Sequence, residues 1–175
     1  MKFDIHNRWT GDVQFTAEID ANESTPRSVK LGLAVKWGVK NGATLADANL
    51  AGANLARANL ADANLAGAYL ADAYLADAYL ADANLAGAKW RDGITITRAP
   101  IQIYNIPGGW PVHILDDHMQ IGCELHSFDE WAGFDDRRII EMDGRDALTF
   151  WNANKAWLLA LCETRREDTA DRSAA

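Results

Sequence analysis

The sequence predicts a mainly β protein that is organised around a short β-helix, and three observations support this prediction. Residues 43–92 consist of ten consecutive five-residue blocks, which begin ATLAD ANLAG ANLAR and run without an insertion. The third residue is Leu in nine of these blocks, from Leu45 to Leu85, and Trp90 in the tenth. The first residue of every block is Ala. A short, unbroken period of this kind indicates stacked structural units with one continuous core.

A period of five fits neither of the ordinary elements. On an α-helix each Leu would lie about 140° from the previous one, which leaves no apolar stripe. On a flat strand an odd period would point successive Leu side chains to opposite faces. The chain can bury every Leu on one side only by turning a corner every five residues. Four blocks then close a square coil of 20 residues, and ten blocks make about 2.5 coils. An Ala-rich helix is the alternative that residue propensity favours, but the recurrent Asn, Asp and Gly argue against it.

This pattern resembles the pentapeptide-repeat family, and the resemblance covers 50 of the 175 residues. It implies a right-handed quadrilateral β-helix with Leu and the block-first Ala pointing inward. Two features depart from the usual family pattern. Ala follows the central Leu where a hydroxyl residue is usual, and three blocks carry Tyr at the second position. The flanking stretches NRWTGDVQFTAEID and HILDDHMQIGCELHSFDEW are similar to small pentapeptide proteins of tailed bacteriophages and prophages, a similarity that implies no particular activity.

Residues 1–42 are predicted to form an N-terminal cap. Alternating apolar residues predict a hairpin over residues 2–19, with its turn at Thr10-Gly11-Asp12. Thr25 is suited to cap a helix that starts at Pro26 and ends at Asn41-Gly42, although Gly32 and Gly38 weaken this helix prediction. We expect the segment to seal the first coil, because an open coil leaves strand edges unpaired. The helix residues expected to face the coil are Leu31, Val35 and Val39.

Residues 93–163 are predicted to form an α+β cap, and the polar residues 164–175 a disordered tail. Ser127 and Glu130 match a capping box, which marks the start of a helix. The cap takes about 70 residues, more than sealing a coil requires. Its predicted elements are strands around Ile94–Ile96 and Ile101–Ile103, a turn at Pro107-Gly108-Gly109, a hairpin of Val112–Leu115 with Met119–Leu125, a short helix over 136–142 broken at Asp143-Gly144, and a helix from about Asp146 to Glu163.

Positions two and five of each block are predicted to point outward, and residues 20 apart to stack about 4.8 Å from each other. Tyr69, Tyr74 and Tyr79 then surround the second coil, one on each of three faces, and we call them the tyrosine collar. Two interpretations stay open for this surface. It is a solvated face, on which charges interact weakly, or it binds a basic or polar partner. The stacks predicted at position five are Asp62 on Asp82, Asp72 on Asp92, and Arg57 over Asp77.

A cluster of His118, Cys123 and His126 is the candidate for chemistry. A zinc site needs about four ligands, usually in closely spaced pairs, and this stretch matches that pattern poorly. A Cys–His nucleophile pair needs a polarised thiolate and a group that orients the His, for which Asp116 or Asp117 is available. Packing roles are the favoured interpretation, because buried Cys behaves as a small hydrophobe. We therefore expect no catalytic residues, no metal and no cofactor.

The net charge of −8 argues against direct nucleic-acid binding, because an acidic surface repels phosphate. No apolar run reaches the 18 residues of a membrane span, and the first residues lack the apolar core of a signal peptide. Two Cys without CxxC spacing are typical of a reduced protein, so we expect a cytoplasmic location.

The function expected from these features is that of a non-enzymatic, phage- or prophage-type protein, which binds a host component through its acidic, Asn- and Tyr-rich β-helix and its cap. One alternative is a DNA mimic that acts on a DNA-binding protein such as gyrase, as some pentapeptide proteins do, although 2.5 coils match only about three or four base pairs. Another is an oligomer that sequesters a small ligand such as a nucleotide, with Arg137 and Arg138 holding phosphates. We also expect a homodimer joined through the cap. Trp151 and Trp157 are the candidate interface residues. Six residues of helix separate them, so they cannot both face one core, and we expect one of them to be interfacial.

Overall fold

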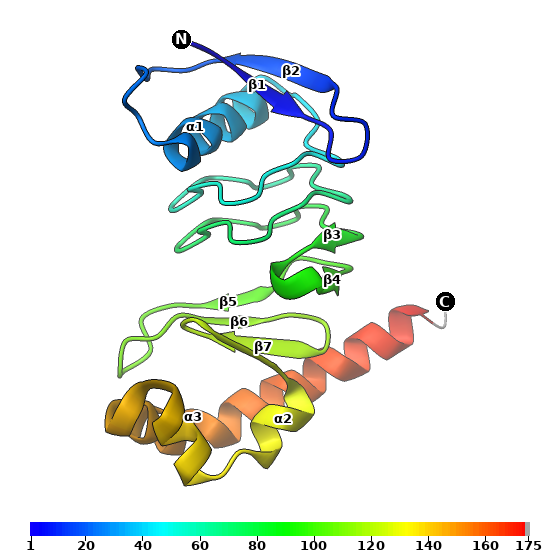
Figure 1. Ribbon diagram of the computed structural model, residues 1–175. Coiled ribbons are helices and arrows are strands. Elements are labelled where there is room, and N and C mark those ends of the chain that lie inside the picture. The colour runs from blue at the N-terminus through cyan, green and yellow to red at the C-terminus, as the bar shows by residue number, and fades with distance from the viewer. Residues whose placement is uncertain (174–175) are drawn as a thin grey trace. The chain divides into compact units, whose positions relative to one another are not determined.

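The computed structural model describes the backbone of residues 1–173, and the side chains of these residues except those of 92 and 170–173. The chain divides into two compact units, Met1–Ala99 and Pro100–Ala175. The first unit contains the predicted N-terminal cap and the repeat, and it extends beyond the repeat to Ala99 because the strand at 95–96 pairs with the last block. Figure 1 labels α1 to α3 and β1 to β7.

The N-terminal segment forms the predicted hairpin and helix. Strands β1 (Lys2–His6) and β2 (Val13–Glu18) pair antiparallel, and helix α1 spans Arg27–Lys40. The prediction that Thr25 caps this helix is wrong. Pro26 is the N-cap residue and no side chain caps the helix, whereas the Thr25 backbone N–H donates to Asn22 Oδ1 at 3.2 Å. Of the three residues expected to face the coil, Leu31 and Val35 are buried and Val39 is half-buried.

Two glycines of α1 allow the helix to approach its neighbours closely. A Cβ atom added at Gly32 would lie 1.9 Å from the Asn54 carbonyl oxygen in the β-helix. A Cβ atom added at Gly38 would lie 2.6 Å from the ring of Phe15 on β2. Glycine weakens a helix prediction because of its low propensity, but here it is required for packing.

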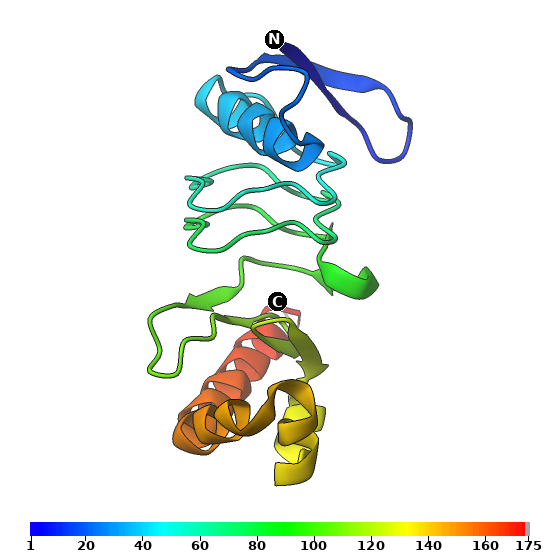
Figure 2. The ribbon, with the colours of Figure 1, turned by 60° about the vertical axis from the view of Figure 1, so that its left-hand side comes forward.

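The repeat forms a β-helix in which residues 20 apart pair as parallel strands. Asn54 pairs with Tyr74 and Asn59 with Tyr79, and Figure 2 shows the coils stacked on one another. All nine block-central Leu side chains are buried, none more than 5% exposed, and most block-first Ala residues are buried beside them. The predictions of a β-helix, of the stacking partners and of the inward Leu are therefore confirmed.

The fifth position of each block has a role that the sequence analysis missed. It adopts the left-handed backbone conformation in every block from Asp47 to Gly87, with φ between 53° and 72°. Gly adopts this conformation freely and Asp tolerates it better than most residues do. The recurrence of Asp and Gly at this position is therefore a requirement of the coil's corners, and it explains much of the acidic surface without a partner.

The last block ends in a short closing structure. Strand β3 (Ala88–Lys89) pairs antiparallel with β4 (Thr95–Ile96), and the 3₁₀ helix η1 (Arg91–Gly93) connects them. Trp90 takes the inward position that Leu has in the other blocks, and it is 5% exposed. An aromatic side chain fills more space than Leu, which suits the end of a stack where the next coil is absent.

The second unit is a four-stranded antiparallel sheet with helices, as the predicted α+β cap requires. Its strand order is β5 (Ile101–Ile103), β6 (Val112–Ile114), β7 (His118–Ile121) and β8 (Glu124–Ser127). The predicted single strand Met119–Leu125 is wrong, because Gly122 turns the chain with φ 58° and separates β7 from β8. The capping box of Ser127 and Glu130 is confirmed at the start of α2 (Phe128–Gly133).

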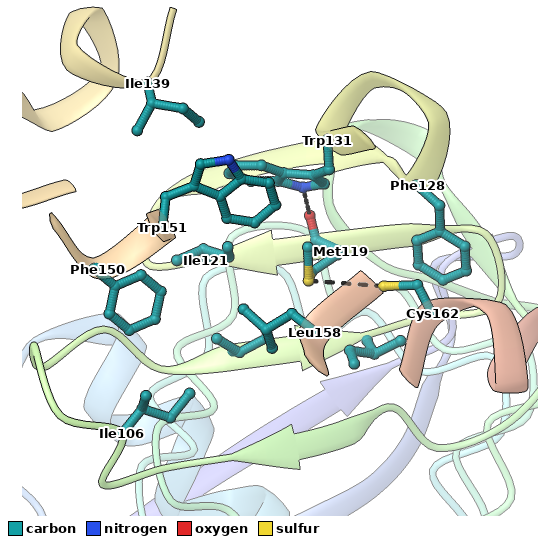
Figure 3. Packing of buried hydrophobic residues seen from close by; sticks show 12 residues of the cluster. Ile106, Met119, Ile121, Phe128, Trp131, Ile139, Phe150, Trp151, Leu158 and Cys162 are labelled. Carbon is teal, nitrogen blue, oxygen red and sulfur yellow. Dashed lines mark hydrogen bonds between the residues drawn. The ribbon is translucent and has the colours of Figure 1, made fainter. Parts of the chain in front are cut away.

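The core of this unit lies between the sheet and the helices (Figure 3). The Trp131 indole donates a hydrogen bond of 2.6 Å to the Met119 carbonyl on β7. Its ring centroid lies 5.1 Å from that of Trp151, which comes from the long helix. Two Trp side chains from different helices therefore hold the helices together against the sheet.

Helix α3 spans Asp136–Ser173, and its backbone is non-helical at Asp143 and Gly144, where the sequence predicts a break. The prediction of disorder from residue 164 is wrong as far as Ser173, and residues 174 and 175 lie outside the described part. Arg165 explains the difference. Its side chain is 6% exposed, and it bonds the Leu115 carbonyl oxygen at 3.0 Å and Asp116 Oδ1 at 3.1 Å.

Candidate binding surfaces

The tyrosine collar lies at the second position of three consecutive blocks. Tyr69, Tyr74 and Tyr79 pair with Asn49, Asn54 and Asn59, respectively, so that each Tyr belongs to a different column of the β-helix, as predicted. Tyr69 is 37% exposed, and Tyr74 and Tyr79 are each 60% exposed. Three large aromatic side chains thus lie on the outside of one coil.

Tyr at this position removes a hydrogen bond that other blocks make. Where the second residue is Asn, its side-chain oxygen accepts the backbone N–H two residues further on, as Asn54 does from Ala56 at 3.2 Å. Tyr has no acceptor that can reach this N–H. A hydrogen bond of this kind contributes about 1 kcal/mol, so the collar places aromatic surface where Asn stabilises the turn. The described residues that make this bond are Thr44, Asn49, Asn54, Asn59, Asn64 and Asn84.

The charged residues at position five interact weakly. Arg57 Nε lies 3.7 Å from Asp77 Oδ2, and both side chains are more than half exposed. Asp62, Asp72 and Asp82 are exposed as well, whereas the side chain of Asp92 lies outside the described residues. On the edge of the β-helix that contains Asp47, the two following coils have Gly67 and Gly87 at the same position, without a carboxylate. The carboxylates at position five are therefore interrupted by Gly and Arg residues, and they do not cover all four edges of the β-helix.

An open groove that the sequence analysis did not predict lies on the column of Asn49, Tyr69 and Lys89. It has a volume of about 430 Å³, is largely open to solvent, and lies between this column and the turn of the N-terminal hairpin. Trp9 in that turn is 70% exposed. A Trp within the polar stretch NRWTGD was the available signal, because turns of this composition seldom need a large apolar side chain. The lining residues are Arg8, Trp9, Asn49, Tyr69, Lys89 and Gly93.

Hydrogen bonds from the first coil and from the turn hold Trp9 in place. Its backbone N–H donates to Asn7 Oδ1 at 2.8 Å, and its indole Nε1 donates to Asp47 Oδ1 at 3.2 Å. The Arg8 backbone N–H donates to the Asp47 carbonyl at 2.8 Å. The Arg8 guanidinium carbon lies 4.2 Å from the Trp9 ring centroid. The exposed indole is therefore ordered by contacts with the β-helix.

His118 and His126 lie in separate pairs with neighbouring carboxylates, and Cys123 is exposed, so the packing role favoured for this Cys is wrong. His118 Nδ1 lies 2.6 Å from Asp117 Oδ1, and His126 Nε2 lies 3.0 Å from Glu124 Oε2. His126 also packs edge-on against the Trp131 and Phe134 rings. Within the described residues, no three His, Cys, Asp or Glu side chains are grouped so that they could hold a metal ion. His126 thus has the packing contacts that the sequence analysis favours.

His113 is a buried histidine, and its surroundings disfavour the protonated form of its ring. Its side chain lies on β6 with 7% exposure, and its Nε2 lies 3.2 Å from the Tyr104 hydroxyl. Burial lowers the pKa of His113 to about 4, because the charged imidazolium loses its solvation there. His113 is therefore neutral at pH 7.

The residues expected to form an interface or a phosphate site are dispersed. Trp151 is 2% exposed and belongs to the core, whereas Trp157 is 38% exposed, so Trp157 is the one of the two that stays a candidate interface residue. Arg137 pairs with Glu141 one turn away at 3.1 Å. The Arg138 guanidinium lies 5.6 Å from the Phe134 ring centroid.

Comparison with known proteins places the repeat in a family. The model for pentapeptide repeats (8 copies) matches residues 41–75 and 58–92, which together include the whole predicted repeat. The segment 41–92 therefore consists of pentapeptide repeats, which the structure folds as a β-helix, and proteins with such repeats are generally non-enzymatic. No curated protein and no solved structure matches the chain. Within residues 1–173, no helix combines the length and the apolar composition that a membrane crossing requires.

Proposed function

We propose that this chain is a non-enzymatic, phage- or prophage-type binding protein that contacts a host component through the tyrosine collar. In this proposal the scaffold is a right-handed quadrilateral β-helix of about 2.5 coils, and position two of each block is the variable recognition position. The observation that carries the proposal is the replacement of a turn-stabilising Asn by an exposed Tyr in three consecutive blocks.

Tyr is well suited to such a contact. It presents a large and rigid apolar ring with a hydroxyl group at its end, and it is enriched at the centre of protein interfaces. Tyr74 and Tyr79, the two most exposed members of the collar, lie on neighbouring faces. A partner that surrounds the corner between these faces could bury both rings, while the exposed Asp62, Asp72 and Asp82 favour a basic or hydrogen-bond-donating contact surface.

The two alternatives have less support. A DNA mimic needs an extended array of carboxylates, whereas the corners of this β-helix mix Asp with Gly and pair Arg57 with Asp77. The pocket that Trp110, Trp131 and Trp151 line in the second unit has a volume of about 40 Å³, which is too small for a nucleotide. The collar therefore remains the surface on which the proposal rests.

The proposal can be tested by capture from a bacterial lysate followed by quantitative mass spectrometry. The bait chains are the full protein, a double variant Tyr74→Asn/Tyr79→Asn, and the control variant Val13→Ala, which removes an exposed apolar side chain of the N-terminal hairpin. We expect a partner that the full chain and the control capture and that the double variant loses by about tenfold or more. Equal recovery of every captured protein by the double variant and the full chain would overturn the collar as the contact surface.

A homodimer joined through the second unit, acting in the cytoplasm, remains part of this proposal. Trp157 and Ile140 are the large apolar side chains that the described part of this unit exposes, at 38% and 39%. The chain has two Cys residues without CxxC spacing, which is typical of proteins of a reducing compartment. Light scattering of the full chain should give a dimer mass that Trp157→Ala reduces, and a monomer at micromolar concentration would refute the dimer.

A further inference from the structure

We propose that the groove lined by Arg8, Trp9, Asn49, Tyr69, Lys89 and Gly93 binds a small aromatic anion of the nucleoside monophosphate class. The site lies in the first unit, where the hairpin turn meets one column of the β-helix. Nothing in this inference depends on the host-binding role of Tyr74 and Tyr79, since neither residue lines the groove.

The aromatic side of the groove is built to remain exposed. Trp9 has the highest exposure of any large apolar side chain in the described residues, at 70%. Two hydrogen bonds fix its orientation, since Asn7 accepts one from its backbone N–H and Asp47 accepts one from its indole N–H. Tyr69, a second ring, lines the same groove. A flat heteroaromatic base could stack on such rings and remove apolar surface from water.

The charged side of the groove is positive in a chain whose net charge is −8. Arg8 and Lys89 both line it, and the lining residues include no carboxylate. Arg8 Nε is buried and has no hydrogen-bond partner within the described part of the chain. The Lys89 ammonium donates to Thr95 Oγ1, and its three N–H groups leave it further donors. Asp47, the carboxylate beside Trp9, accepts the indole hydrogen bond. Two cations without an acidic lining residue favour an anionic ligand such as a phosphate.

The size and the remaining polar group of the groove favour a small ligand over a macromolecule. Its volume of about 430 Å³ falls in the range of small-molecule sites. The Asn49 side-chain oxygen already accepts the Ala51 N–H at 3.3 Å, so that its amide N–H₂ group remains as a donor. The groove thus offers rings for stacking, cations for a phosphate and an amide donor for an acceptor atom on the base or ribose.

Isothermal titration calorimetry of the full chain with the four common nucleoside 5′-monophosphates tests this inference. At least one of them should bind with a Kd below about 1 mM. The matching nucleoside and inorganic phosphate should each bind at least about tenfold more weakly, because each lacks one half of the recognised chemistry. Trp9→Ala and Lys89→Gln should each weaken binding by about tenfold.

Matched controls separate this site from unspecific effects. Arg57→Gln removes an exposed cation from the same β-helix, so it should bind the nucleotide as the original chain does. Tyr74→Asn/Tyr79→Asn should also leave it unchanged. Trp9→Phe keeps an aromatic ring at this position, so it should bind the nucleotide more tightly than Trp9→Ala does. It also keeps the site testable if Trp9→Ala does not fold.

Three results would overturn the inference. The first is the absence of binding by all four monophosphates at about 1 mM. The second is binding that neither Trp9→Ala nor Lys89→Gln changes. The third is inorganic phosphate that binds as tightly as any nucleotide, which would reduce the groove to a simple anion site. Trp9-dependent binding of an acidic peptide without nucleotide binding would replace the proposed ligand class by a protein partner.

Discussion

The two units of this chain obtain their cores in opposite ways. In the β-helix, every block uses the same inward Leu and Ala and pairs with a block 20 residues away. In the second unit, each stabilising contact occurs once. The Trp131 and Trp151 rings meet there, and Arg165 reaches Asp116 across 49 residues of sequence. A repeated core is specified by a local rule, whereas a unique core depends on contacts between distant residues.

This difference also determines which positions of each unit are available for binding. In the β-helix the inward and corner positions are constrained, so that variation concentrates at position two, where Asn, Tyr, Thr and Lys occur. The tyrosine collar and the Lys89 side of the groove both occupy that position. In the second unit most aromatic residues are committed to the core, and Trp157 is the exposed Trp among its described residues.

We expect the largest loss of stability from a substitution in the repeated core of the β-helix. Leu70→Asp places a charge at an inward position that is 3% exposed, where no partner compensates its lost solvation. We expect a loss of more than about 4 kcal/mol in the free energy of unfolding, or no folded first unit. Urea denaturation followed by circular dichroism measures it. Tyr74→Asp, at a 60% exposed position four residues away, is the control and should change stability by no more than about 1 kcal/mol. A Leu70→Asp variant as stable as this control would contradict the inward orientation of Leu70.

The repeated unit could be predicted from sequence almost in full, since its rule is visible within each block. The stacking partners, the inward Leu and the collar all follow from the period of five. The left-handed corner at position five was missed, although the alternation of Asp and Gly was a usable signal. The groove was missed because it requires the turn at Trp9 to lie against Asp47, a contact over 38 residues that no period encodes.

The second unit was predicted less well for the same physical reason. Local signals were sufficient for the capping box at Ser127 and for the break at Asp143-Gly144. Polar composition alone predicted disorder after residue 163, but Arg165 anchors this segment to Leu115 and Asp116 in the sheet region, and the segment is helical as far as Ser173. The burial of Trp151 and the exposure of Trp157 likewise depend on which side of α3 the sheet covers, which the helix sequence does not state.

The next effect tests the contact on which the end of α3 depends. Arg165→Met leaves the buried Asp116 carboxylate without its guanidinium, and we expect a loss of about 3–5 kcal/mol in the stability of the second unit. Arg166→Met is the adjacent control. Its ion pair with Asp129 is 2.8 Å long but exposed, so its loss should be below about 1 kcal/mol. Urea denaturation monitored by Trp fluorescence measures both. Equal effects of the two substitutions would show that the burial of Arg165 contributes nothing.

A pH titration should also distinguish the units, because the second one contains His113. The pKa of this His is lowered from 6.5 to about 4, so the unfolded chain binds its proton first as the pH falls. Stability that is present above pH 6.5 is then lost between about pH 6.5 and 4, up to about 3 kcal/mol. Urea midpoints of the full chain and of His113→Gln between pH 7.5 and 4.5 measure this. The variant should lose this part of the pH dependence, and an unchanged slope would show that His113 does not cause it.

The smallest expected effect concerns the collar itself and has the opposite sign. Tyr74→Asn restores the side chain that accepts a backbone N–H in the neighbouring columns, as Asn54 does from Ala56 at 3.2 Å. We expect a gain of about 0.5 kcal/mol in the stability of the first unit, because the new hydrogen bond outweighs the packing lost by a ring that is 60% exposed. Urea midpoints compare this variant with Asn84→Ala, which removes such a bond and should lose about 1 kcal/mol. A Tyr74→Asn variant that is more stable yet fails to capture the partner would show that Tyr is kept for binding at the expense of the fold. A loss of stability above about 1 kcal/mol would instead make Tyr74 a structural residue and remove the main support for the collar as a binding surface.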